Sequence, residues 1–427
     1  MTRSTQFAQL GALLLEAGFS ATDTRDALEE IRARRAPEQE LAFAVLPEAV
    51  FVSPAEGSEG SILRMSLASS LSTRQSAMVS RMMHRLRDGE ISLERALGAE
   101  QDRIRAAWMR KPLLRWIVGN ALLAGGLAVL FRCPWWAVVV STLVAALMGA
   151  VAVLLRRIRP AAAIVPFVIA LLSTVLVSES ASMLGYTTVP LFAVCAPIAI
   201  LVPGAMITNA LLELTSADVV TGASRLVYGV VQLGFMAAGV AAGSAWIGLE
   251  IDQDSAFLLA DVAGIISADP AWASLPSTVF SWIGVAAVAI GISLAFGAGY
   301  RLTAVSIAAM GVAYALLIGL APFWGNTVAT GATAAVLFVI ARLVERSSFA
   351  IPATITFQPA FLLLVPGTVG LVAITSFDID PVAAALAIFA SLCIGTKLGS
   401  IIVDTHWWRL VTGRRIVTVG GGAAQPE

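Results

Sequence analysis

Leu201-Val202-Pro203-Gly204 recurs later in the chain as Leu364-Val365-Pro366-Gly367. Each copy lies near one end of an apolar stretch long enough to cross a lipid bilayer. If five crossings separate the two copies, they run in opposite directions through the membrane. That pattern is typical of secondary transporters built from inverted repeats. The repeated tetrapeptide therefore favours a ten-helix carrier made of two five-helix halves.

The composition excludes an ordinary soluble globular protein. Hydrophobic residues make up 58% of the 427 residues and charged residues only 13%, with a mean hydropathy of +0.84. Residues 1–115 hold most of the Arg, Asp and Glu, whereas the remainder is mainly Ala, Val, Leu, Ile and Gly. The sequence thus predicts a polytopic membrane protein with a separate polar amino-terminal part.

The polar part predicts a small α+β domain over residues 1–110. Helical spacing of apolar residues and short alternating runs separated by Pro and Gly predict helices and strands. No secretory signal peptide is recognised, so we expect a cytoplasmic domain. Arg81, His84, Arg85 and Arg87 could form an anion site, but a solvated charged helix face is the favoured interpretation.

Ten apolar stretches follow, each long enough for a hydrocarbon core of roughly 30 Å. They lie at residues 114–131, 134–155, 160–178, 188–211, 225–248, 277–299, 302–320, 325–343, 350–374 and 381–404. The predicted first repeat occupies residues 111–250 and the second residues 277–405. An acidic extracytoplasmic loop, 251–276, separates them, and residues 406–427 form a tail.

The distribution of arginine supports this topology. With a cytoplasmic amino terminus, nearly all arginines between the spans fall in inner loops, and only Arg132 falls outside. The longest outer segment carries four aspartates and no Lys or Arg. Both termini are therefore expected in the cytoplasm.

The two Pro-Gly pairs predict broken helices in the fourth and ninth spans. Pro removes a backbone donor and clashes with the preceding turn, and Gly lowers the cost of irregular backbone. A break leaves amide N–H groups at the start of the following half-helix, where a carboxylate is a suitable partner. The alternative is that each pair only kinks its helix.

Polar residues near the breaks extend this hypothesis to a binding site for a small zwitterion. Asn326 is included with them, although it could simply bond between helices, as could Asn120 and Gln232. The candidate substrate-binding residues are Pro203, Gly204, Thr208, Asn209, Gln358, Pro366, Gly367 and Asn326.

Two charged residues are candidates for coupling or charge pairing. Lys397 lies within the tenth span, where it could pair with a carboxylate or extend toward the cytoplasm. Glu213 lies at the inner end of the fourth span. No Asp or Glu occupies the centre of a predicted span, so proton coupling does not follow from these residues alone.

The chain resembles the threonine/serine exporter family of bacterial amino acid carriers along nearly its whole length. The resemblance rests on residues 10–18 (LGALLLEAG), residues 46–53 (LPEAVFVS) and the two Leu-Val-Pro-Gly copies. It implies a cytoplasmic amino-terminal domain, ten spans in the bacterial cytoplasmic membrane, and export of threonine and serine driven by the proton gradient. The transported amino acid, protons and the lipid bilayer are then the expected partners, and a homo-oligomer stays open.

Other function classes have less support. No zinc-protease, hydrolase-elbow or Walker motif occurs, and neither His84 nor His406 lies in a span, so we predict no enzyme, metal or cofactor. Nothing indicates nucleic-acid binding. A channel, a transporter for another small polar solute, and a sensor that uses the amino-terminal domain stay open as alternatives.

Overall fold

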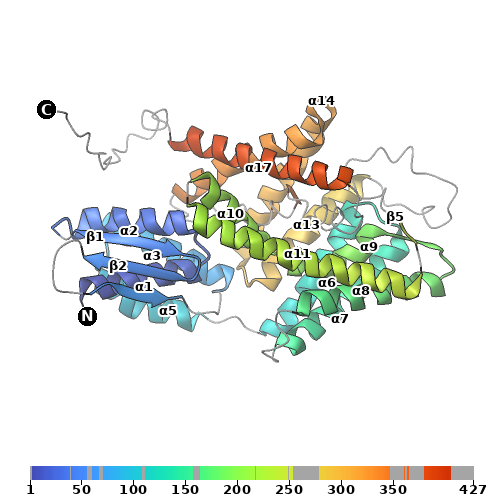
Figure 1. Cartoon of the computed structure of the whole chain (residues 1–427), viewed down its shortest axis with the longest axis horizontal. Coiled ribbons are helices and arrows are strands. Elements are labelled where there is room, and N and C mark those ends of the chain that lie inside the picture. The colour runs from blue at the N-terminus through green and yellow to red at the C-terminus, as the bar shows by residue number, and fades with distance from the viewer. Residues whose placement is uncertain are drawn as a thin grey trace.

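The structure is a computed structural model that describes most of the chain. The described residues are 2–38, 40–54, 60–66, 71–107, 111–156, 164–216, 218–248, 250–252, 278–346, 360, 363–364 and 379–404. Figure 1 shows a mixed α and β unit at one end of an elongated molecule and a group of helices at the other. The first unit, residues 2–107, is called the N-terminal unit below.

The N-terminal unit is built from a three-stranded antiparallel sheet and surrounding helices. Its elements are α1 (Arg3–Glu16), α2 (Ala21–Arg35), β1 (Leu41–Leu46), β2 (Ala49–Pro54), β3 (Ile62–Met65), α3 (Thr73–Asp88), α4 (Leu93–Arg95), the π-helical η1 (Ala96–Glu100) and α5 (Gln101–Ala106). The strand order is β1-β2-β3, and the β1–β2 register runs from Leu41 opposite Pro54 to Leu46 opposite Ala49. The three strands lie within residues 1–110, the segment for which the sequence predicts both helices and strands.

Local signals explain where these helices begin and end. Ser20 caps α2, and Ser72 and Gln75 form a reciprocal capping box at the start of α3. Gly89 ends α3 in the left-handed conformation, with φ of 83°. The helical segment from Leu93 to Ala106 is interrupted at Gly98, where φ is −99° and ψ is −105°. The unit has its own apolar core around Phe7, Leu10, Leu14, Leu28, Ile31, Val50 and Leu86.

The rest of the described chain is almost entirely helical. Its elements are α6 (Pro112–Leu130), α7 (Trp135–Arg156), α8 (Val165–Met183), β4 (Thr188–Pro190), α9 (Leu191–Cys195), the 3-10 helix η3 (Ala196–Leu201), α10 (Gly204–Thr215), α11 (Val219–Ile247), β5 (Glu250–Asp252), α13 (Thr278–Ala295), α14 (Tyr300–Arg346) and α17 (Ile379–Asp404). Among the described residues, six helices are long and apolar enough to cross a membrane. Leu191–Leu201 and Val279–Ala295 are shorter apolar helices. The chain is therefore a multi-pass membrane protein.

Helix α14 is a hairpin rather than one straight rod. Gly325 has φ of 74° and ψ of 164°, which interrupts the helix shortly after Pro322. Leu302, from the start of α14, and Val344, from its end, both pack against Ala77 of α3. In an unbroken helix these two residues would be about 60 Å apart. The two parts correspond to the predicted spans 302–320 and 325–343.

Glycines allow three pairs of helices to pack closely. On α6 and α13, a Cβ at Gly119 would lie 2.7 Å from the carbonyl oxygen of Gly291. Gly243 of α11 faces Thr174 of α8, where a Cβ would be 2.7 Å from the threonine Cβ. Gly399 of α17 faces the carbonyl oxygen of Ala335 in α14, also at 2.7 Å. Such contacts are how helices associate in a bilayer, where neighbouring helices gain little from the hydrophobic effect.

The ten-span, 5+5 arrangement stays a prediction. Most of the predicted ninth span, 350–374, lies outside the described residues, as does the acidic loop apart from Ile251 and Asp252. Two spans are shifted from their predicted positions. The third, predicted at 160–178, begins at Val165 as α8, and the fifth, predicted at 225–248, begins at Val219 as α11.

Candidate functional site

The fourth predicted span is broken, as the Pro-Gly pair indicates. It enters as α9, continues as the tightly wound η3, passes Val202 and Pro203 in non-helical conformation, and resumes as α10 at Gly204. Pro197 and Pro203 have no N–H, so the carbonyls of Ala193 and Ala199 lose their ordinary partners four residues ahead. The Val202 N–H donates instead to the Ala199 oxygen at 3.2 Å.

Side chains from four neighbouring helices bond to backbone carbonyls of the segment before the break. Ser141 of α7 donates to the Ala193 oxygen at 2.8 Å, which replaces the donor lost at Pro197. The other donors are Ser173 of α8 to Val194 at 3.4 Å, Asn120 of α6 to Pro197 at 3.4 Å, and Gln232 of α11 to Leu201 at 3.0 Å. Because irregular backbone within a membrane needs such partners, these contacts fix the first half of the broken span.

The second half begins with backbone donors. The first bond of α10 runs from the Ile207 N–H to the Pro203 oxygen at 3.0 Å. Ala205 and Met206 occupy the first turn, where amide N–H groups have no carbonyl partner within the helix. The positive end of the helix dipole points the same way. This end of α10 can therefore hold an anionic group, and a carboxylate is the simplest one.

The middle and the carboxyl-terminal part of α10 contact the N-terminal unit. Asn209 donates from Nδ2 to the Gly18 oxygen at 3.2 Å. Glu213 is fully buried, pairs with Arg225 of α11, and accepts a bond from the Ala21 N–H at 2.8 Å. Since Ala21 is the first residue of α2, the Glu213 carboxylate lies at the positive end of that helix.

Further ion pairs join the N-terminal unit to the helices. Asp218, just before α11, accepts two bonds from Arg25 at 2.7 Å and 3.1 Å. Arg342 of α14 donates to Asp23 at 2.6 Å. Burial alone would raise the pKa of Asp23, but the charge and hydrogen bond of Arg342 outweigh it and hold that pKa below its usual value. The start of α2 is therefore fixed to α10, α11 and α14 together.

The remaining candidate residues form no hydrogen bond or ion pair with this cluster among the described residues. Asn326 is exposed beside the turn of the α14 hairpin, about 27 Å along the helix from Val344. Lys397, on α17, is half-buried and pairs with no carboxylate in the part of the chain that the structure describes. The Thr208 side chain, Gln358, Pro366 and Gly367 lie outside that description.

Several residues of this arrangement were missed by sequence reasoning. Pro197 was a readable signal, because a second proline within one span predicts further unpaired carbonyls. Ser141 and Ser173 carried no signal, since serine in an apolar helix often bonds to its own backbone. Arg225 was counted only among the inner-loop arginines, and Asp218 was not singled out. The contacts of Arg225 with Glu213 and Pro47, and of Asp218 with Thr22 and Arg25, depend on tertiary structure.

Comparison with known proteins identifies a family. The profile of the family described as "Putative threonine/serine exporter" matches residues 6–246, which is more than half of the chain. The match covers the N-terminal unit and the helices through α11, including the broken span. No curated protein and no solved structure gives a significant match.

Proposed function

The chain belongs to the putative threonine/serine exporter family, and from that premise we propose that it exports threonine and serine across the bacterial cytoplasmic membrane. Transport is coupled to the proton gradient and proceeds by alternating access. Both termini lie in the cytoplasm, and the N-terminal unit covers the inner side of the helices. The protein works as a carrier, not an enzyme.

The observation that carries this proposal is the start of α10 within the broken span. The amides of Ala205 and Met206 bind the substrate carboxylate, in the manner of the discontinuous helices of other carriers. Thr208 and Asn209 follow in the next turn and are proposed to supply neutral hydrogen-bonding groups, with the Asn209 Oδ1 atom accepting from the substrate ammonium while Nδ2 stays bonded to the Gly18 oxygen. In the second half, Pro366, Gly367 and Gln358 are proposed to provide the matching surface.

Helix packing supports two related halves. The third and fifth predicted spans, α8 and α11, pack through Gly239 and Gly243 of α11. The eighth and tenth, the end of α14 and α17, pack through Gly395 and Gly399 of α17, at the same spacing. The first and sixth, α6 and α13, pack against one another through glycines on both helices. The third helix thus packs against the fifth in both predicted halves. The two halves contact each other through the first helix of each, α6 and α13.

The proposed topology also agrees with the position of the N-terminal unit. It contacts the α10–α11 junction through Glu213 and Asp218, the end of α13 through Phe296, and both ends of α14 through Leu302 and Val344. Each of these junctions lies on the inner side of the membrane in a ten-span arrangement. A single unit that contacts all of them must be released or carried along when the halves move.

Glu213 is proposed as the proton-carrying residue. It is fully buried, and its Oε2 atom has no hydrogen-bond partner among the described residues. Protonation would cancel its attraction for Arg225 and weaken its bond with the start of α2. Proton binding would therefore loosen the contact between α10 and the N-terminal unit. Lys397 remains a candidate for pairing with the substrate carboxylate, since α17 also packs against α10.

The test is counterflow of labelled threonine in proteoliposomes, with and without a pH gradient. Saturable exchange that serine inhibits and the gradient shifts is the expected result. A Cβ at Gly204 would meet nothing within 4 Å, so Gly204→Leu can be accommodated while covering the first-turn amides. The matched control is Gly319→Leu, at a helical glycine of α14 that is equally open.

We expect Gly204→Leu to abolish exchange and Gly319→Leu to preserve it. Equal exchange by both variants would overturn the site, and flux without any exchange would indicate a channel. No exchange of any amino acid by folded protein would overturn the exporter assignment.

A further inference from the structure

We infer that the N-terminal unit contains a second binding site, for a phosphoryl group, in the pocket between α3 and α5. This site is separate from the transport site at α10. Its volume is ≈ 510 Å³, which is within the range of small-molecule sites. Four arginines and one carboxylate line it: Arg74, Arg81, Arg85, Arg103 and Glu100. Met78, Met82, Ile104, Ala106 and Ala107 form the rest of the surface.

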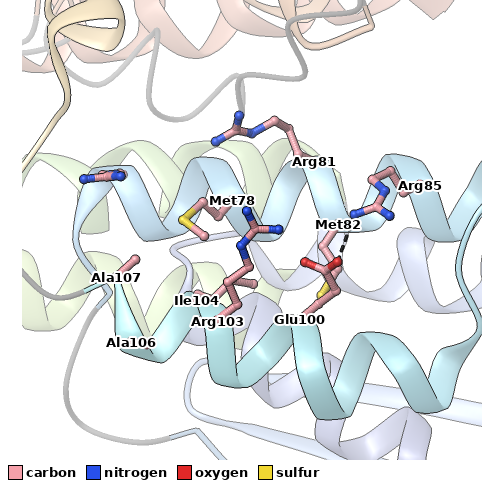
Figure 2. A pocket seen from close by; sticks show the side chains of 10 residues that line it. Met78, Arg81, Met82, Arg85, Glu100, Arg103, Ile104, Ala106 and Ala107 are labelled. Carbon is pink, nitrogen blue, oxygen red and sulfur yellow. Dashed lines mark hydrogen bonds and ion pairs between the residues drawn. The ribbon is translucent and has the colours of Figure 1, made fainter.

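The positive charge of the pocket is largely uncompensated. Arg85 is the arginine that Glu100 neutralises, at 3.0 Å, and Figure 2 shows the two side chains joined at one end of the pocket. Within the described part of the chain, Arg81 bonds to the Ala77 oxygen of its own helix, at 3.3 Å, and to no carboxylate. Arg74 and Arg103 have no carboxylate partner within the described residues. Three guanidinium groups therefore line one pocket without a counter-charge.

Placing these charges here is unfavourable for the unit by itself. Arg74 lies in the first turn of α3, where the helix dipole repels a positive charge, and that turn contains no acidic residue. Arg81 lies about two turns further along the same helix, and because both side chains are exposed, solvent screens part of their repulsion. Figure 2 shows Arg103 rising from α5 toward α3, which adds a third charge. A bound anion removes all of these repulsions.

The chemistry of the lining favours a phosphoryl group. Guanidinium groups bind phosphate with paired, charge-assisted hydrogen bonds, and three of them suit a doubly charged anion better than a zwitterionic amino acid. Met82 and Ile104 form a buried apolar floor, which can contact an organic group attached to the phosphate. The site thus fits a phosphate ester.

The ligand can come from solution or from the membrane surface. Thr73, at the start of α3, bonds through its N–H to the Phe296 oxygen at the end of α13, at 2.9 Å. Shortly after Ala107, α6 begins at Pro112 with Leu113 and Leu114 exposed. The pocket is therefore close to where the helices would enter a bilayer. A soluble phosphate compound and the headgroup of an anionic phospholipid share the required chemistry.

The experiment measures binding of radiolabelled pyrophosphate to the full-length protein in nanodiscs of phosphatidylcholine. Saturable binding is expected, with affinity lowered at least about 10-fold by the double variant Arg81→Ala/Arg103→Ala. The matched control, Arg64→Ala/Arg95→Ala, removes the same charge from exposed positions outside the pocket and should bind as the unchanged protein does.

Glu100→Gln makes the test independent of folding. It removes the single carboxylate that lines the pocket and leaves Arg85 with only its pair to the exposed Glu90 among the described residues, so affinity should rise severalfold, which damage to the fold would not produce. A second arm counts phosphatidylglycerol molecules retained by the delipidated protein, using native mass spectrometry. Retention that depends on Arg81 and Arg103 and weakens pyrophosphate binding assigns the headgroup as ligand, whereas pyrophosphate binding alone assigns a soluble phosphate compound.

Absence of saturable binding for both probes would overturn the site. So would equal binding by the pocket and control double variants, or an unchanged affinity in Glu100→Gln.

Discussion

Polar side chains are used differently around the broken span and at the junction with the N-terminal unit. Around the break, neutral donors such as Ser141 and Gln232 bond to backbone carbonyls. At the junction, ionised pairs such as Arg25–Asp218 and Arg342–Asp23 join separate segments. Neutral bonds fix irregular backbone without burying charge, whereas ion pairs next to water can separate and re-form at modest cost. The molecule thus combines a fixed half-span with a junction that can open.

The largest expected effect is at Glu213, whose fully buried carboxylate pairs with the largely buried Arg225, unlike the more exposed pairs Arg25–Asp218 and Arg342–Asp23. Glu213→Leu leaves Arg225 buried without its counter-charge, so we expect a loss of about 3–5 kcal/mol in free energy of unfolding. Titration with denaturing detergent measures this quantity. Glu30→Leu, which breaks partly exposed pairs of α2, should cost about 1 kcal/mol or less. Similar losses in both variants would contradict the distinction between the buried Glu213 carboxylate and the partly exposed pairs of Glu30.

The neutral bonds around the break predict a second, smaller effect. Ser141→Ala leaves the Ala193 oxygen buried without a donor, at an expected cost of about 1–3 kcal/mol. Thr174→Val is the matched control, because the equally buried Thr174 hydroxyl bonds to the Ala170 oxygen of its own helix. That variant should change the unfolding free energy little. If the two variants behave alike, the carbonyls of the broken span do not depend on these donors.

The ion pairs of the junction predict a dependence on pH. Since Arg342 holds the pKa of Asp23 below its ordinary value of 3.8, this contribution to docking is complete above pH 3.8. It is lost as pH falls through the lowered pKa. Spin labels at Arg34→Cys and Arg301→Cys, with the native cysteines replaced, should give a narrow distance distribution from pH 8 to about 5.

Arg342→Gln tests the same pair at neutral pH. The distance distribution should broaden already at pH 7, because one link between α2 and α14 is lost. A distribution that stays narrow in the variant would show that this pair does not hold the unit in place.

The smallest effect is expected at Asn326. Its side chain is exposed at the hairpin turn, about 27 Å along the helix from Val344, which contacts the N-terminal unit. Asn326→Ala should alter the unfolding free energy by no more than about 0.5 kcal/mol and leave threonine exchange intact. Loss of exchange in a stable variant would place this turn in the transport path.

Local patterns predicted most elements of the fold, but not the contacts between them. Alternating apolar residues predict strands in the N-terminal unit, such as those within residues 41–54. Hydropathy predicts the span that begins near residue 114, and the missing backbone donor of Pro203 predicts the break at Pro203–Gly204. Asn209 and Glu213 were recognised as candidates because they are polar residues near an apolar span. Their bonds to Gly18 and Ala21 join segments far apart in sequence, so no local pattern contains them.

In the candidate site, too, some features are predictable from local sequence and others depend on tertiary contacts. The donors at the start of α10 follow from Pro203 and Gly204 alone. The donors that fix the preceding carbonyls come from α6, α7, α8 and α11, and which serine or glutamine reaches which carbonyl depends on helix packing.

The most direct test of the central claim is competition against labelled threonine bound to the purified protein. Serine and threoninol are the two competitors, since threoninol keeps the hydroxyl and ammonium groups but lacks the carboxylate that the α10 amides are proposed to bind. Serine should compete, and threoninol should be weaker by about 100-fold or more. Equal competition by threoninol would contradict binding of the substrate carboxylate at the start of α10.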